Sequence, residues 1–203
     1  MPVKIYGSPQ RRSPLKNLFV SIILFFTIST AQAQLFLGVK LMGISFHPGE
    51  NINGPVFKYS IGKKNRVAFN LGLAIGIEYK FNYWFSIKVD QAAFRDCGGK
   101  FAGMTMFNFR YTQQLGKSGD GSAGLGPFLF YRKSWKTIDG YIDEGYFRET
   151  KNKKWQTKFV WYGTELEHNY PLRKGLDIST NILPGIPVVF ALTSGLRFSN
   201  PSE

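Results

Sequence analysis

The sequence predicts an all-β protein, an eight-stranded antiparallel up-and-down transmembrane β-barrel preceded by a cleavable signal peptide helix. Two observations carry this prediction: apolar residues alternate with small or polar ones along most of the chain, and the N-terminal segment has the composition of a secretory leader. Apolar residues make up 43% of the 203 residues, which argues against intrinsic disorder. We therefore expect a signal peptide over 1–33, a β-barrel over 34–198 and a short C-terminal tail over 199–203.

The expected leader has basic residues and no acidic residue before an apolar run over 18–28, which is followed by Ala31-Gln32-Ala33. This order of charge, apolar run and small residues predicts cleavage between Ala33 and Gln34. The alternative, a membrane anchor, is disfavoured because a helix of this length reaches only about half of the ~30 Å hydrocarbon core. Removal of the leader lowers the formal net charge from +13 by its four basic residues, so the mature chain stays basic.

Period-two alternation marks the strands. It is strongest over 68–81, where every odd-numbered residue from Phe69 to Phe81 is apolar and the even-numbered residues are small or polar. The same pattern recurs between turn-forming segments. We expect eight strands, at 35–46, 67–81, 85–94, 103–113, 123–133, 155–167, 175–182 and 188–198.

Each expected strand has one apolar face. In chain order these faces comprise Leu35, Leu37, Val39 and Leu41; the odd positions from Phe69 to Phe81; Phe85, Ile87 and Val89; Phe107, Phe109 and Tyr111; Leu125, Leu129 and Tyr131; Phe159 and Trp161; Leu176, Ile178 and Ile182; and Val188, Phe190, Leu192, Leu196 and Phe198.

The composition of the opposite faces decides whether the apolar faces point into the barrel or out of it. They carry charged residues and glycines, such as Lys40, Gly72, Gly76 and Glu78. Glycine packs nothing on a solvent-facing strand but fits a crowded barrel interior. Polar and small residues inside with an apolar belt outside are typical of a transmembrane barrel. The alternative is a soluble lipocalin-like ligand binder, which needs the apolar face inside.

Loop lengths and aromatic residues support the same architecture. The longest gaps, 47–66 and 134–154, follow the first and fifth strands and are expected to be external, whereas the tight turn 82–84 is expected to be periplasmic. Aromatic residues gather where strand ends meet the membrane interface. The expected girdle residues are Tyr79, Phe81, Tyr83, Trp84 and Phe85 at the turn, and Tyr131, Trp135 and Trp155 at the large loop.

Four segments carry a resemblance to a known family: 34–40, 78–81, 124–128 and 193–198. Together they resemble the outer-membrane β-barrel domain family, the small porin-like eight-stranded barrels of Gram-negative bacteria. The resemblance implies a place in the outer membrane of such a bacterium, contact with its lipid and lipopolysaccharide, and insertion by the barrel assembly machinery. It implies a structural or surface-interaction role, the runner-up being an accessory barrel of a secretion or surface-assembly machine.

An eight-stranded lumen is just wide enough for side chains to fill it, so charged inward residues are expected to neutralise one another. A three-residue turn over 82–84 pairs Phe81 with Phe85, and hence Glu78 with Lys88, which predicts an ion pair. The alternative is a proton or small-ion path. The expected lumenal charge network comprises Lys40, Glu78, Lys88, Asp90, Arg110, Arg132, Asp177 and Arg197.

The two long loops are expected to form a basic contact surface, suited to lipopolysaccharide phosphates or simply solvated, and a protein partner is expected to bind there if the chain has one. Export and the barrel pattern argue against a nucleic-acid partner. The expected basic contacts are Lys58, Lys63, Lys64, Arg66, Lys151, Lys153 and Lys154.

We expect no enzyme, no cofactor and no metal. A lipid A-modifying enzyme is the alternative, and it would use His47 at the external rim with Asp139 or Asp143. His168 is expected at the other end of the barrel. Cys97, the single cysteine, is expected to be incidental, with intermolecular pairing as the alternative.

Overall fold

The computed structural model describes residues 34–47, 52–62, 64–185 and 189–199. The predicted leader and its cleavage residue Ala33 lie outside these residues, and Gln34 is the first residue of β1. The strands are β1 (Gln34–Phe46), β2 (Ser60–Ile61), β3 (Val67–Lys80), β4 (Phe85–Arg95), β5 (Phe101–Gln114), β6 (Asp120–Lys133), β7 (Arg148–Glu149), β8 (Trp155–Arg173), β9 (Leu176–Gly185) and β10 (Val189–Ser199). Among the described residues, no helix is long and apolar enough to cross a membrane.

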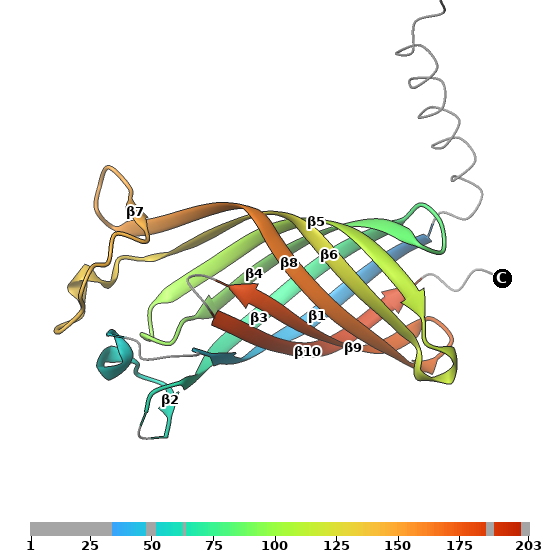
Figure 1. Cartoon of the computed structure of the whole chain (residues 1–203), viewed down its shortest axis with the longest axis horizontal. Coiled ribbons are helices and arrows are strands. Elements are labelled where there is room, and N and C mark those ends of the chain that lie inside the picture. The colour runs from blue at the N-terminus through green and yellow to red at the C-terminus, as the bar shows by residue number, and fades with distance from the viewer. Residues whose placement is uncertain (1–33, 48–51, 63, 186–188, 200–203) are drawn as a thin grey trace, which may run out of the picture.

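Eight of these strands close into an antiparallel barrel (Figure 1), which confirms the predicted fold. Each long strand pairs with the next along the chain, and β1 pairs with both β3 and β10. Leu37, for example, lies opposite Ile77 on one side and Phe198 on the other. Because closure pairs the first strand with the last, the barrel has no free edge that could add another chain. The short β2 and β7 pair with β3 and β8 in the loop region.

The barrel is polar inside and apolar outside. Along β1 the side chains alternate between buried and exposed, so Leu41 is 65% exposed whereas its neighbour Lys40 is 5% exposed. On β3 the apolar Leu73 and Ile75 point outward, and the charged Glu78 is buried. Pleating sends successive side chains to opposite faces. This polarity is the inverse of that of a soluble barrel, whose interior is apolar.

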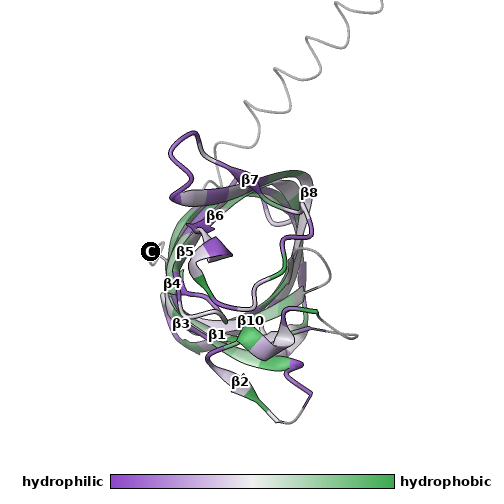
Figure 2. Cartoon of the chain, turned by 90° about the vertical axis from the view of Figure 1, so that its left-hand side faces the viewer, coloured by the Kyte–Doolittle hydropathy of each residue, from purple (hydrophilic) through white to green (hydrophobic). Residues whose placement is uncertain are grey.

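The two ends of the barrel differ. The connections from β1 to β3, from β4 to β5 and from β6 to β8 lie at one end, which we call the loop end, and their described residues include the short helices Gly54–Val56 and Trp135–Thr137. Short turns at 81–84, 115–119 and 174–175 join the strands at the other, the turn end. Figure 2 views the closed ring of strands from the loop end, where the segment around β7 is largely hydrophilic.

β8 contains a bulge that the sequence analysis did not anticipate. Phe128 of β6 pairs with Val160, and Gly126 pairs with Gly163, so Trp161 and Tyr162 of β8 both lie opposite the single residue between them on β6. That residue is Pro127, which has no N–H to donate to the ladder. The extra residue of a bulge is left unpaired in the ladder, so a bulge can lie opposite a proline, which has no N–H with which to pair.

The bulge reverses which face of β8 points inward. Before it, the buried residues have even numbers, as Gln156 does; after it they have odd numbers, as Gly163, Glu165 and Glu167 do. Trp161 and Tyr162 are both exposed. The strand also continues to Arg173, six residues beyond the predicted end at 167, with a second irregularity near Pro171.

Candidate functional site

The half of the barrel interior nearer the turn end holds a network of buried charged side chains. Seven of the eight predicted lumenal residues belong to it: Lys40, Glu78, Lys88, Asp90, Arg110, Asp177 and Arg197. Four more that the sequence analysis did not name complete it: Lys80, Asp120, Glu165 and Glu167. The described members are therefore five cations and six carboxylates, a nearly balanced set. The interior of the barrel is where such balance matters, because an unpaired charge there loses hydration without compensation.

Arg110 of β5 is the centre of this network. Its guanidinium is fully buried and lies 3.0 Å from Glu78, 2.8 Å from Glu167 and 3.7 Å from Glu165. These carboxylates come from β3 and β8, so Arg110 joins strands that lie on different sides of the barrel. A planar guanidinium suits this role because it offers five N–H donors in a fixed plane.

Lys88 and Lys40 bind the same acids from other directions. The Lys88 ammonium lies 2.5 Å from Glu165, 2.8 Å from Glu167 and 3.2 Å from Asp90. The Lys40 ammonium lies 2.5 Å from Glu167 and donates a hydrogen bond to the Asn181 side chain. Glu167 is thus shared between cations of β1, β4 and β5, and Glu165 between cations of β4 and β5, a cooperative arrangement in a medium of low dielectric.

The predicted ion pair between Glu78 and Lys88 does not form. The two residues are opposite each other across β3 and β4, as the three-residue turn predicted. However, the Glu78 carboxylate binds Arg110 and Arg197 and accepts a hydrogen bond from the Ser86 hydroxyl, and the Lys88 ammonium turns to the acids of β8. The acids across the lumen therefore compete successfully for Lys88.

Arg197 closes the network at the turn end. Its guanidinium lies 3.3 Å from Glu78, 3.3 Å from Asp120 and 3.4 Å from Asp177, and it stacks 3.9 Å from the centre of the Phe36 ring. The cavity left among the side chains around Glu78 and Arg197 measures about 10 Å³, the space of a single water.

Glu165 and Glu167 were missed because of the bulge in β8. Phe159 and Trp161 define an odd-numbered apolar face in the sequence, which places Glu165 on the outside if the alternation is continued without interruption. The extra residue at the bulge turns both acids inward. The signal that could have revealed them is Pro127, which marks a break in the neighbouring ladder.

Arg132 is the predicted network member that lies elsewhere. It is buried near the loop end, where its Nε donates to Gln156 Oε1 at 2.9 Å and its Nη2 donates to the Tyr141 hydroxyl at 3.3 Å. Its guanidinium stacks 4.0 Å from the ring centres of both Trp135 and Phe147. Among the described residues no carboxylate lies within ion-pair distance of it.

Trp135 also differs from its prediction as a girdle residue. It is 3% exposed, and its indole N–H donates to Asp96 Oδ2 at 2.7 Å on the inside of the loop end. Its ring packs edge-on against Phe57 of the first loop. Tyr131 and Trp155, the other two predicted girdle residues at this end, lie on the outer face in contact with each other.

Six of the seven predicted basic contact residues are described by the structure, and they lie on the loops at the loop end. Lys58, Lys64, Lys151, Lys153 and Lys154 are exposed, and Arg66 is half-buried. Lys63 lies outside the described residues.

His47 does not meet the carboxylates that an enzyme would need. Its Nε2 lies 3.2 Å from the Ser45 hydroxyl, and its ring packs 4.8 Å from that of Phe57. Within the described part of the chain, its Nδ1 has no hydrogen-bond partner. Asp143 instead binds Lys136 at 3.0 Å. The described part of the chain also contains no group of three histidine, cysteine or acidic side chains arranged to hold a metal.

The remaining two residues that the sequence analysis singled out are His168 and Cys97. His168 lies on β8 toward the turn end, where Nε2 is 2.8 Å from the Ser118 carbonyl oxygen. Cys97 is buried among Phe57, Ala68 and Trp135, and burial raises the pKa of its thiol to about 12. A buried thiol held protonated is a poor partner for intermolecular pairing.

Acidification should destabilise the loop end through His47. Burial lowers the pKa of His47 from its ordinary 6.5 to about 4, so the folded state keeps it neutral while the unfolded chain takes up a proton below about 6.5. Stability is therefore full above pH 6.5 and falls by about 1–3 kcal/mol as the pH drops toward 4. The measurement is thermal unfolding from pH 7 to 4. His47→Gln should flatten this dependence, and an unchanged slope in that variant would contradict the assignment.

Comparison with known proteins yields similarity of structure only. The chain matches no protein-family model, and no characterised protein matches its sequence. It is similar to a crystal structure of Ail, the attachment invasion locus protein of Yersinia pestis, with 13% identity and a TM-score of 0.44 over 82% of this chain and 97% of that chain. Ail in complex with the heparin analogue sucrose octasulfate gives 11% identity and a TM-score of 0.42 over the same shares.

Proposed function

We propose that this chain is an integral outer-membrane β-barrel of a Gram-negative bacterium, with a sealed lumen and a basic external surface. The observation that carries the proposal is the inverted polarity of the barrel, with apolar side chains such as Leu71, Leu73 and Ile75 exposed around charged residues that are buried. A belt of this extent is costly in water and is the surface that a bilayer requires.

The polar side chains of the outer face support a lipid environment. Thr105 donates to Gln91 Oε1 at 2.7 Å, and Gln91 Nε2 donates to the Tyr131 hydroxyl at 2.7 Å. The Thr180 and Ser194 hydroxyls likewise lie 3.2 Å apart. Polar groups facing water need no such partners, whereas polar groups facing hydrocarbon do. On the outward faces of the described barrel strands, lysine and arginine occur only toward the strand ends: Arg95, Lys133 and Arg173.

The charge network argues for a sealed barrel rather than a diffusion pore. Arg110 of β5 and Glu165 and Glu167 of β8 are buried in the lumen, and a barrel of eight strands is only just wide enough for its own side chains. Function then belongs to the loop end. Its exposed lysines suit the phosphates of lipopolysaccharide, which attract cations by charge and by hydrogen bonding.

The location and closure are tested together by fractionating the native host and running the extracted protein on gels, heated and unheated. We expect outer-membrane enrichment, a mobility shift on heating, and no single-channel conductance in planar bilayers. A soluble periplasmic protein without a mobility shift on heating would overturn the proposal and favour the alternative, a soluble lipocalin-like ligand binder. Steady conductance would overturn the sealed lumen alone.

The surface role is tested by charge removal at one end of the barrel. Replacing Lys151, Lys153 and Lys154 with glutamine should weaken retention on lipopolysaccharide-coated beads severalfold at low salt, because exposed charges act most strongly when unscreened. The matched control removes the same charge at the turn end, through glutamine at the exposed Lys117, Arg173 and Lys174. Equal losses in the two triple variants would refute a specific role for the loops.

A further inference from the structure

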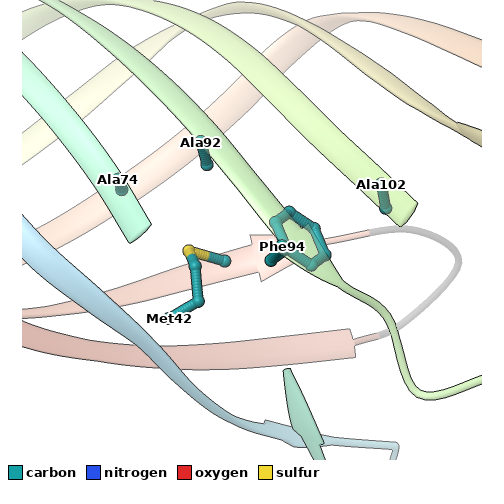
Figure 3. Packing of buried hydrophobic residues seen from close by; sticks show 5 residues of the cluster. All are labelled: Met42, Ala74, Ala92, Phe94 and Ala102. Atoms are coloured by element: carbon teal, nitrogen blue, oxygen red, sulfur yellow. The ribbon is translucent and has the colours of Figure 1, made fainter. Parts of the chain in front are cut away.

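The half of the lumen nearer the loop end holds a chamber with largely apolar walls. A cavity of about 150 Å³ lies there, and its walls include Met42, Phe94, Met104, Met106, Phe128 and Leu183. These residues come from five barrel strands, so the chamber sits inside the ring. Figure 3 shows two of these residues, Met42 and Phe94, in a buried apolar cluster with Ala74, Ala92 and Ala102.

The chamber has the composition of a binding site rather than a packing defect. Protein interiors are packed as densely as organic crystals, and a cavity of this size with largely apolar walls is rare in them. All three methionines that follow Met1 line it. Methionine is flexible and polarisable, and so is suited to a surface that adapts to a guest. By contrast, the cavity beside Glu78 and Arg197 in the charged half of the lumen measures about 10 Å³.

The lining of the chamber includes a buried cation, Arg132, which has no carboxylate within ion-pair distance in the part of the chain that the structure describes. Arg132 lines the cavity, is 7% exposed and is held between the Trp135 and Phe147 rings. Asp96, the buried acid of the same lining, is already occupied, since Oδ2 accepts from Trp135 Nε1 and Oδ1 accepts from the Lys100 N–H at 2.9 Å. Glu144, the other acid of the lining, is exposed to solvent at the rim.

We propose that the chamber binds a small monocarboxylate with an apolar tail, such as a medium-chain alkanoate. The tail occupies the space between Met42, Met104 and Met106, and the carboxylate binds the Arg132 guanidinium. A guanidinium is the cation best matched to a carboxylate, and its burial strengthens the contact. The proposal rests on the barrel interior alone and does not depend on the membrane location or on the basic loops.

The test is equilibrium dialysis of isotopically labelled octanoate against the full-length mature protein in lipid nanodiscs, with empty nanodiscs as the blank. We expect saturable binding, about tenfold tighter than that of octanol, because the alcohol lacks the charge that Arg132 recognises. Ala191→Leu, which fills the chamber wall, should abolish binding. The matched control is Ala93→Leu, the same change on the outer face of β4.

Arg132→Gln should remove the preference for octanoate over octanol while leaving octanol binding in place. No saturable binding by the wild-type protein, equal affinity for octanoate and octanol, or equal effects of the two alanine substitutions would each overturn the proposal. Because none of these three outcomes involves Arg132→Gln, the proposal stays testable even where that variant fails to fold.

Discussion

Arg110→Met should destabilise the folded barrel by about 3–5 kcal/mol, the largest effect that we expect from a single substitution. The arginine side chain is fully buried and lies between Glu78, Glu165 and Glu167. Methionine replaces its volume but not its charge, so the three carboxylates lose a shared partner in a place where water cannot replace it. The cost comes mainly from those uncompensated acids and less from the lost contacts themselves.

The measurement is the temperature at which the compact form on unheated gels converts to the unfolded form. Asp177→Asn is the control, since Asp177 makes a single ion pair with Arg197 and is partly exposed at the turn end. Adding Glu165→Gln to Arg110→Met should recover part of the loss, because it removes one of the unpaired acids. If Arg110→Met lowered the conversion temperature no more than Asp177→Asn does, the network would not be what holds the interior together.

Ile75→Arg should cost about 2–4 kcal/mol of folding free energy in a bilayer, the second large effect. Ile75 lies near the middle of β3, is 51% exposed and is flanked by Val39 of β1 and Gln91 of β4. An arginine there would sit near the bilayer midplane and lose its hydration. On a soluble barrel the same substitution would place a charge in water and leave stability nearly unchanged.

Ile61→Arg gives a matched control for that experiment. Ile61 is similarly exposed, but it lies on β2 in the loop region, outside the barrel. Urea titration of folding into lipid vesicles measures both variants. A small effect at both positions would show that the outer face of the barrel is not in contact with lipid.

The barrel could be predicted from the sequence because its strongest signal is local. Alternation over 68–81 defines both faces of β3, and the short turn after it fixes the register that places Glu78 opposite Lys88. The ion-pair partners of these side chains could not be predicted in the same way, because Lys88 binds acids that reach it from across the lumen. Register restricts which backbones are neighbours, but the choice of ion pair depends on every charge in the interior.

The loop end could not be predicted in the same way. Arg132 and Trp135 continue the pattern of the neighbouring strand in the sequence, and nothing local reveals that the segment 134–154 folds back over the lumen and contacts them. The apolar chamber was missed for a related reason, since Met42, Met104 and Met106 occupy inward positions among polar and charged residues. It appears only when strands distant in sequence are brought together.

The bulge at Trp161 and Tyr162 makes the orientation of all later side chains of β8 depend on the number of residues in the strand. Deleting either residue would leave all other residues in the chain unchanged. It would shift the inward–outward alternation of the strand by one residue and so send Glu165 and Glu167 to the outer face. A bilayer would then meet two carboxylates, and Arg110 would lose two of its three partners. Homologues should therefore keep the length of this strand more strictly than its residues. Where the extra residue is missing, we expect Pro127 to be missing as well, since a residue with an N–H can pair without the bulge.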